Sequence, residues 1–268
     1  MAILNCRKIL QEQNASDRCA ITSINLTHRA LGDVSCLSEF KNLEKLELGF
    51  NNLTSLESLM LCVNLKWLSV VSNNLHSLKG IEGLSKLTVL NAGKNKLKSM
   101  NEVETLTSLR ALILNDNEMT SVCKLHHMKE LNTLVLSRNP ISSLGESLMK
   151  LKSIAKLSLS NCKLVSVDLP FKSCLELKEL RLAHNEITSI PDGFRCLVKL
   201  HILDMGNNLI TSWSSVKVLS SLANLKNLNL QGNPIAERDD LLYKVEKLFP
   251  CLQIFNARQM DKLSKKEQ

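Results

Sequence analysis

The chain has 268 residues, of which 44% are hydrophobic and 22% are charged, so it can bury a large core and does not have a disordered composition. Its formal net charge is +8 at pH 7, but basic and acidic residues are interleaved along the sequence, apart from Lys262, Lys265 and Lys266. This pattern argues against a nucleic-acid-binding surface, and an aromatic share of 3% is too low for stacking on single-stranded bases. We therefore expect no direct contact with nucleic acid.

The amino-terminal segment from Met1 to Leu10 contains polar and charged residues where a secretion signal needs an uninterrupted apolar stretch. No run of about 18 apolar residues occurs in the sequence, so we expect no membrane span. Nine cysteines, an odd number without a tight spacing pattern, are typical of a reducing compartment. We therefore expect an intracellular protein, cytoplasmic, nuclear or both, in which all nine cysteines are free thiols and the fold needs none of them paired.

The first residues predict a helix that caps the rest of the structure. Ile3, Cys6 and Leu10 lie near helical spacing, which favours a helix over residues 2–12. This helix would belong to an amino-terminal capping segment, residues 1–20.

One repeated pattern occupies residues 21–237. It reads Leu43-x-x-Leu46-x-Leu48-x-x-Asn51-x-Leu53 and recurs at intervals of 22 residues that lengthen to 23 and 25. A degenerate copy precedes the series around Ile24, with Arg29 where asparagine is expected, and another follows it, built on Leu252 and Phe255. The nine good copies begin at Leu43, Leu65, Leu87, Leu109, Leu131, Ile154, Leu177, Leu200 and Leu225.

Each copy is expected to contain a short strand, because Leu46 and Leu48 lie two residues apart and point to the same face. One coil cannot cover its own leucines, so we expect stacked coils with parallel strands and a continuous core. After each asparagine the apolar residues recur every third position, which predicts short 3-10 or helical turns on the outer side. The segment from Trp213 to Leu222 is the best candidate for a true helix.

The asparagine at position nine of the repeat is interpreted as structural, because its amide can satisfy backbone groups where the strand turns away. Cys162 takes this position in one copy. The asparagines are Asn51, Asn73, Asn95, Asn117, Asn139, Asn185, Asn208 and Asn233.

The pattern resembles the leucine-rich repeat over roughly residues 21–260. The 22-residue spacing and the trailing Asn51-Asn-Leu53-Thr-Ser-Leu56 resemble its short intracellular class, whose best-known member regulates protein phosphatase type 1. The resemblance implies an α/β fold class: a leucine-rich repeat solenoid with a curved parallel sheet on the concave face and short 3-10 or helical segments on the convex face. It also implies a protein partner, with a phosphatase catalytic subunit as one candidate.

Residues 238–260 are expected to close the solenoid. The segment from Asn233 to Leu252 resembles a carboxy-terminal cap shared by this class and a spliceosomal A-prime-type protein. Asp239 and Asp240 would open its helix, since acidic residues suit a helix amino terminus. A polar tail, residues 261–268, would follow. The predicted buried face of the helix is Leu241, Leu242, Val245, Leu248 and Phe249.

The sequence contains no phosphate-binding glycine loop, no dinucleotide-binding fingerprint and no nucleophile elbow. Cys123, His126 and His127 are close enough in sequence to suggest a metal site, but they fall on the predicted convex face without a second cluster. No serine, histidine and acid show a spacing typical of a triad. We therefore expect no enzyme, no cofactor and no metal.

The side chains expected to contact a partner are those on the open concave face, at positions three and five of each copy. Five of these positions in the second to fifth copies hold apolar residues, and exposed apolar surface usually marks an interaction site. The alternative is that strands simply favour β-branched residues, although a solvent-facing Trp67 is hard to explain in that way. A basic stretch follows, in which Glu179 and Asp204 reduce the positive charge that Lys178 and Lys226 contribute. The predicted partner-binding residues are Phe50, Trp67, Val89, Ala111, Ile113, Val135, Arg138, Lys156 and Arg181.

The function predicted from these features is that of a non-catalytic scaffold or adaptor, monomeric on its own, that presents its concave face to a protein. A partner with an apolar helix or loop and an acidic flank would complement both halves of that face. Two alternatives remain: a regulatory subunit of a type 1 phosphatase catalytic subunit, and a component of a ribonucleoprotein assembly held through a protein partner.

Overall fold

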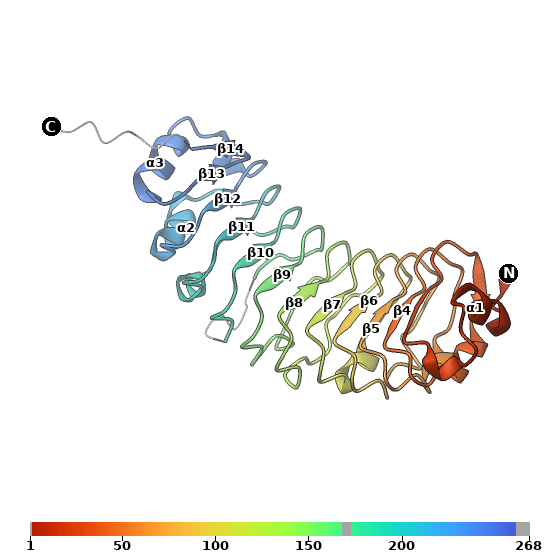
Figure 1. The fold of residues 1–268 in the computed structure, drawn as a ribbon. Coiled ribbons are helices and arrows are strands. Elements are labelled where there is room, and N and C mark those ends of the chain that lie inside the picture. Colours follow the sequence, from red (N-terminus) through yellow and green to blue (C-terminus); the bar gives the residue numbers. More distant parts are fainter. Residues whose placement is uncertain (1, 168–172, 261–268) are drawn as a thin grey trace.

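The computed structural model describes residues 2–167 and 173–260, and it forms a curved solenoid of stacked coils (Figure 1). Within these ranges twelve strands form one sheet in chain order, and every neighbouring pair is parallel except β13 with β14. The predicted tail, residues 261–268, lies outside the described residues. The strands are β2 (Ser23–Asn25), β4 (Lys45–Glu47), β5 (Trp67–Ser69), β6 (Val89–Asn91), β7 (Ala111–Ile113), β8 (Thr133–Val135), β9 (Lys156–Ser158), β10 (Glu179–Arg181), β11 (Ile202–Asp204), β12 (Asn227–Asn229), β13 (Ile254–Phe255) and β14 (Arg258–Gln259).

A column of leucines forms the core, as the repeat predicts. The central residue of each three-residue strand pairs in register with that of the next, for example Leu90 with Leu112 and Leu112 with Leu134. All three side chains are fully buried. Each coil therefore covers the leucines of its neighbour, which is why the coils are stable only as a stack.

The asparagine at position nine fastens successive coils to each other. In Asn95 the amide nitrogen donates to the carbonyl oxygens of Val70 and Ala92, both at 3.0 Å. Its amide oxygen accepts from the backbone nitrogen of Leu75 at 3.1 Å. These bonds satisfy buried backbone groups and confirm the structural role of the ladder. Cys162 makes only long sulfur contacts in its place, 3.7 Å from the oxygen of Leu136.

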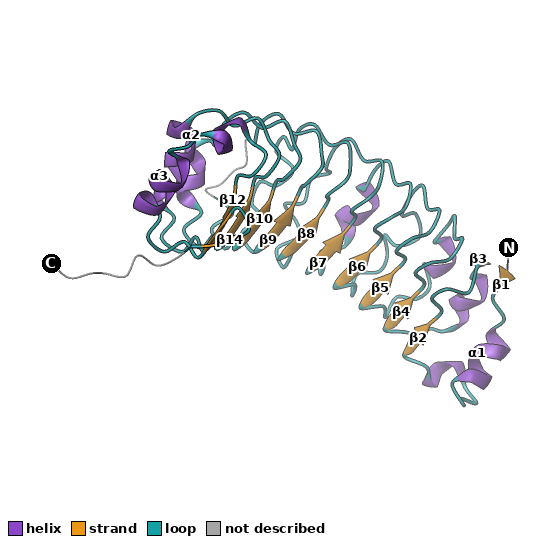
Figure 2. Ribbon diagram, turned by 90° about the horizontal axis from the view of Figure 1, so that it is seen from above, coloured by secondary structure: helices purple, strands orange, loops and turns teal. Residues whose placement is uncertain are grey.

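Short helical segments cover the convex side, opposite the sheet (Figure 2). The helix expected from Trp213 to Leu222 is present as α2 (Trp213–Lys217) followed by η6 (Val218–Ser221). None of the helices in the described ranges is long and apolar enough to cross a membrane. The remaining convex 3-10 segments are η2 (Ser35–Glu39), η3 (Glu57–Leu59), η4 (Asn101–Thr105) and η5 (Asp192–Cys196).

The amino-terminal cap differs from the expected single helix over residues 2–12. Strand β1 (Ala2–Ile3) pairs with β3 (Leu31–Asp33), so residues 2 and 3 are extended. Helix α1 (Cys6–Glu12) begins only after Asn5, whose side chain accepts a hydrogen bond from the backbone nitrogen of Arg7 at 2.9 Å. An asparagine in this capping position starts a helix, and this explains the shorter element. The segment ends with η1 (Arg18–Ala20).

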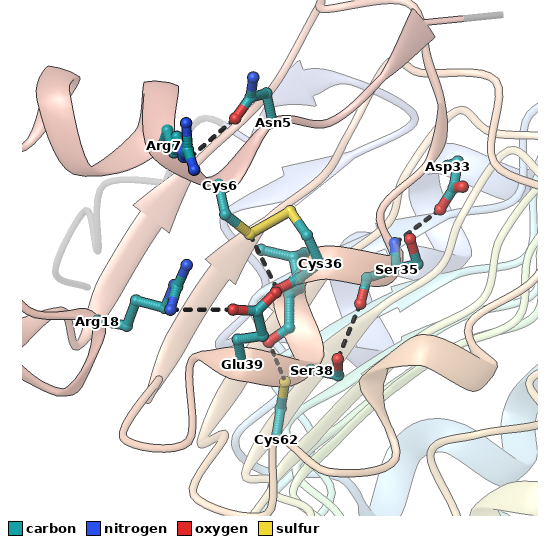
Figure 3. The surroundings of a disulfide bond; sticks show 11 residues. Asn5, Cys6, Arg7, Arg18, Asp33, Ser35, Cys36, Ser38, Glu39 and Cys62 are labelled. Carbon is teal, nitrogen blue, oxygen red and sulfur yellow. Dashed lines mark hydrogen bonds and ion pairs between the residues drawn. A yellow bond between two sulfur atoms is a disulfide. The ribbon is translucent and has the colours of Figure 1, made fainter.

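A disulfide joins Cys6 of α1 to Cys36 of η2 (Figure 3). The prediction that all nine cysteines are free thiols is therefore wrong for this pair. The fold packs α1 against η2 and brings the two Cα atoms within 6.0 Å, although the residues are 30 positions apart in the sequence. The remaining seven cysteines are free.

The carboxy-terminal cap consists of η7 (Pro234–Glu237), α3 (Leu241–Leu248) and the final strand pair. Leu241, Val245 and Phe249 are buried on one side of α3, as predicted, and Leu248 is half-buried. Leu242 is 50% exposed, so its place on the buried face was predicted wrongly. In a helix of 3.6 residues per turn, Leu242 lies about 100° from Leu241 and faces away from the last coil.

Candidate concave binding surface

Two rows of side chains run along the concave sheet, because the strands pair without a shift in register. One row joins Trp67, Val89 and Ala111, and continues to Thr133 and Lys156. The other row joins, in order, Ser69, Asn91, Ile113, Val135 and Ser158. The structure thus brings together five of the six apolar residues predicted from the sequence.

These five residues form what we name the apolar patch: Trp67, Val89, Ala111, Ile113 and Val135. Trp67 is 40% exposed, and the other four residues are half-buried. The ammonium of Lys45 lies 5.4 Å from the centroid of the Trp67 ring, on the neighbouring strand β4. A cation–π contact of this kind is only modestly favourable, and it leaves the rest of the indole uncovered by Lys45.

Phe50 lies in a different place from the apolar patch. It follows β4 at position eight of its coil, where the backbone takes a left-handed conformation with φ of 57°. Phe50 is 47% exposed, and its ring stacks on His28 of the preceding coil, with centroids 4.3 Å apart and an interplanar angle of 11°. Phe50 therefore extends the surface toward the amino-terminal cap.

The three predicted basic residues are all engaged in ion pairs. Arg138, also at position eight, binds Asp116 through two hydrogen bonds, one of them 2.7 Å long. Lys156 and Arg181 both bind Glu179, with 3.2 Å between the Lys156 ammonium and the carboxylate. The later half of the face is consequently closer to neutral than its composition suggests.

The two carboxylates show the effect of these contacts in their pKa values. The hydrogen bond from Arg138 is the main reason that the pKa of Asp116 lies below its ordinary value. Burial alone would raise the pKa of Glu179, but the hydrogen bonds and charges of Arg181 and Lys156 together outweigh it and lower the pKa. Both groups are therefore ionised at neutral pH.

Two residues of the surface escaped the prediction. Lys45 lies beside the Trp67 ring, and Thr133 fills the row between Ala111 and Lys156. Both occupy position three of the repeat, so the same periodicity that singled out Trp67 could have found them.

The cysteine and histidine cluster on the convex side shows no metal-site geometry. The ring centroids of His126 and His127 lie 3.8 Å apart. Burial is the main reason that the pKa of the Cys123 thiol rises to about 12, so the sulfur stays protonated. A protonated thiol is a poor ligand and nucleophile. Among the residues with defined positions, no group of three or more histidine, cysteine, aspartate or glutamate side chains could hold a metal ion.

Comparisons with known proteins agree with this architecture. Residues 175–218 match the family described as Leucine Rich repeats (2 copies). A comparison with curated protein sequences finds no match. Similar solved structures include an internalin of Listeria monocytogenes, with 20% identity and a TM-score of 0.64, where the match covers 97% of this chain and 92% of the internalin.

Two further structures are similar over part of their length. The functional domain of InlJ from Listeria monocytogenes has 23% identity and a TM-score of 0.74, with 92% of this chain and 56% of that domain covered. The ectodomain of the Arabidopsis thaliana receptor kinase GASSHO1/SCHENGEN3, solved in complex with CASPARIAN STRIP INTEGRITY FACTOR 2, has 23% identity and a TM-score of 0.69; 82% of this chain and 28% of the ectodomain chain are covered. Repeat sequence, stacked parallel strands and structural neighbours together identify the chain as a leucine-rich repeat solenoid.

Proposed function

We propose that this protein is a non-catalytic scaffold or adaptor that binds a protein partner on its concave face, centred on the apolar patch. The observation that carries the proposal is the half-exposed Trp67, which lies in register with Val89 and Ala111 on an open sheet. Tryptophan dominates the energetics of many interfaces because it buries a large area with little loss of conformational freedom.

The rest of the concave face supports the same role. A rigid sheet fixes the two rows before binding, so little conformational entropy is lost on association. The plant ectodomain among the structural neighbours was solved in complex with CASPARIAN STRIP INTEGRITY FACTOR 2, which supports the proposal of a partner-binding solenoid. We expect the partner to present an apolar helix or loop to the apolar patch and acidic groups to Arg138, Lys156 and Arg181.

Affinity purification from native cells tests the proposal. Wild type and Trp67→Ala, alone or with Ile113→Lys, serve as baits, and mass spectrometry identifies the captured proteins. We expect both variants to lose the partner and to melt like the wild type. Trp213→Ala is the matched control, because Trp213 lies on the convex side in α2 and also has a lysine near its ring, 5.8 Å away. Normal capture by Trp67→Ala would exclude the apolar patch as the binding surface.

The same experiment separates the two alternative roles. Capture of a type 1 phosphatase catalytic subunit would make the protein a regulatory subunit, as the repeat class suggests. Capture of ribonucleoprotein components would match the resemblance of the cap to a spliceosomal protein. In that case a salt titration against generic RNA should show no steep salt dependence of direct binding, because contact runs through a protein.

We also propose that the protein works inside the cell, in the cytoplasm, the nucleus or both. Seven free cysteines support a reducing compartment, and the Cys6–Cys36 bond counts against it. Counting thiols in protein isolated from its native cells under non-reducing conditions decides the matter. We expect seven thiols, as in the structure, and protection of most of the nine cysteines as disulfides would overturn the intracellular assignment.

A further inference from the structure

A row of exposed aliphatic side chains lies on the rim where the chain enters strands β10, β11 and β12. Each of these strands is preceded by a tight turn, closed by hydrogen bonds such as that from the Leu200 nitrogen to the Leu197 oxygen at 2.9 Å. The two central residues of the turn are exposed, and the first of them is Leu175, Val198 or Ala223. Leu175 is 48% exposed and Val198 is 50% exposed. We name these three residues the rim ridge.

The rim ridge is specific to the last coils. At the same position of the turn, five of the six preceding repeats carry a polar or charged residue, and Val63 is the exception. The turn itself does not require an aliphatic side chain at this position, because polar residues occupy the same position in the preceding coils. The corresponding residues of the preceding coils are Lys41, Val63, Ser85, Thr107, Lys129 and Lys152.

A parallel row of residues lies three positions further along each coil: Lys178, His201 and Lys226. The backbone holds this row in register, since the oxygen of Lys178 accepts from the nitrogen of His201 at 2.8 Å and the oxygen of His201 accepts from Lys226 at 2.9 Å. Lys178 and Lys226 are exposed, and within the part of the chain that the structure describes neither ammonium has an ion-pair partner.

Two acidic groups beside this row are already engaged in ion pairs. Glu176 binds Lys199 at 2.6 Å, and Glu179 is held by Lys156 and Arg181. The two free lysines therefore give the rim a local positive charge beside the rim ridge. A surface of this kind complements an apolar partner that carries acidic groups on one flank.

The spacing of the coils indicates the conformation of that partner. Adjacent strands are about 4.8 Å apart, so the rim ridge spans about 10 Å over three coils. Successive turns of an α-helix rise about 5.4 Å and stay nearly in step with the coils over this length. Side chains on one face of an extended strand repeat about every 6.8 Å and fall out of step.

We propose that the rim of the last three coils is a second interaction surface, which takes an acidic amphipathic helix of a partner protein. Leucine-like side chains on one face of the helix would pack against Leu175, Val198 and Ala223. Acidic side chains on the adjoining flank would pair with Lys178 and Lys226. This surface lies outside the apolar patch, so its occupation is independent of the partner proposed for the concave face.

The test uses the full chain and a synthetic helical peptide of about 18 residues, with leucines at helical spacing and glutamates along one flank. Fluorescence anisotropy should show binding that weakens with salt, whereas a peptide with lysines in place of the glutamates should bind at least about tenfold more weakly. Two double variants should each lower the affinity for the acidic peptide by about tenfold or more. They are Leu175→Ser with Val198→Ser, and Lys178→Glu with Lys226→Glu.

Matched controls keep the test specific to the rim ridge. Val63→Ser and Lys129→Glu change the same turn position in other coils, and Trp67→Ala changes the apolar patch; all three should bind the acidic peptide like the wild type. Thermal melting checks that each variant is folded. The proposal fails if the peptide does not bind, if both peptides bind equally, or if the rim variants bind normally. It also fails if the wild type dimerises and Leu175→Ser with Val198→Ser abolishes the dimer, because a second copy is then the occupant.

Discussion

The two halves of the concave sheet share one backbone and one leucine core, but their exposed rows differ. From β5 to β8 the rows contain the apolar patch, four of whose five side chains are purely aliphatic and can form no hydrogen bond or ion pair. From β9 to β12 the rows contain polar side chains that pair with each other, within one strand or with the next coil. Lys156 and Arg181 bind Glu179, and the amide of Asn229 donates to Asp204 at 2.8 Å.

This difference shows that a repeat determines to which face a side chain points. It does not determine whether that side chain already has a hydrogen-bond or ion-pair partner within the protein. Polar side chains that bind their neighbours gain little from a partner, because new contacts must replace existing ones. Half-exposed apolar side chains can gain only when something covers them. We therefore expect the first half of the sheet to provide most of the binding energy and the second half to provide selectivity.

The largest expected effect is in the core, where the two halves should be alike. Leu112 lies beneath the apolar patch in β7 and Leu180 lies beneath the paired rows in β10, and both are fully buried. Leu112→Ala and Leu180→Ala should each lower the free energy of unfolding by about 2–5 kcal/mol through loss of contacts and cavity formation. Chemical denaturation measures both. A large cost at one site and a negligible cost at the other would show that the halves differ in their cores as well.

The second effect concerns the amino-terminal end, where the Cys6–Cys36 bond fastens α1 to η2. Cys6→Ala with Cys36→Ala should lower the free energy of unfolding by about 2–4 kcal/mol, because the bond restricts the unfolded chain over 30 residues. Hydrogen exchange should localise the loss to α1 and the first coil, and leave β9–β12 protected. Cys174→Ala is the control, since Cys174 is buried in a later coil and free. Equal loss of protection along the whole solenoid would contradict a local role.

The architecture could be predicted from the sequence because the same pattern of buried residues recurs in nine copies. Alternating leucines determine the buried face, and Asn95 and its counterparts bind the groups that their position implies. Contacts between distant residues could not be predicted in this way. Cys6 belongs to the irregular amino-terminal cap and Cys36 to the degenerate first coil, and the pairing of Lys156 and Arg181 with Glu179 depends on side-chain conformations in two adjacent coils. The same limit applies to Phe50, whose stacking on His28 joins two turns and not two strands.

A smaller effect is expected for partner binding, and it contrasts the two halves directly. Ile113→Lys should weaken the captured partner by about 2 kcal/mol or more, roughly 30-fold, because it places a charge in the covered apolar patch. Arg181→Ala should change affinity by less than about 1 kcal/mol, since its guanidinium is already bound to Glu179. Calorimetry with the identified partner measures both. A larger loss for Arg181→Ala would place the main contact in the second half.

The smallest effect is the pH dependence of the paired rows. The pKa of Glu179 lies below its ordinary value of 4.5 in the folded protein, so its charged form stabilises the fold above that value and the contribution is lost as pH falls through the folded pKa. Glu179→Gln should therefore lower stability at pH 7 by no more than about 1 kcal/mol, because Lys156 and Arg181 are half-exposed and screened by solvent. Thermal melting of wild type and variant from pH 7 downward should show the difference closing below pH 4.5. Asp192→Asn, at a carboxylate that is 84% exposed in its ion pair, should melt like the wild type throughout. A difference that persists at about pH 2 would mean that Glu179 acts through packing and not through its charge.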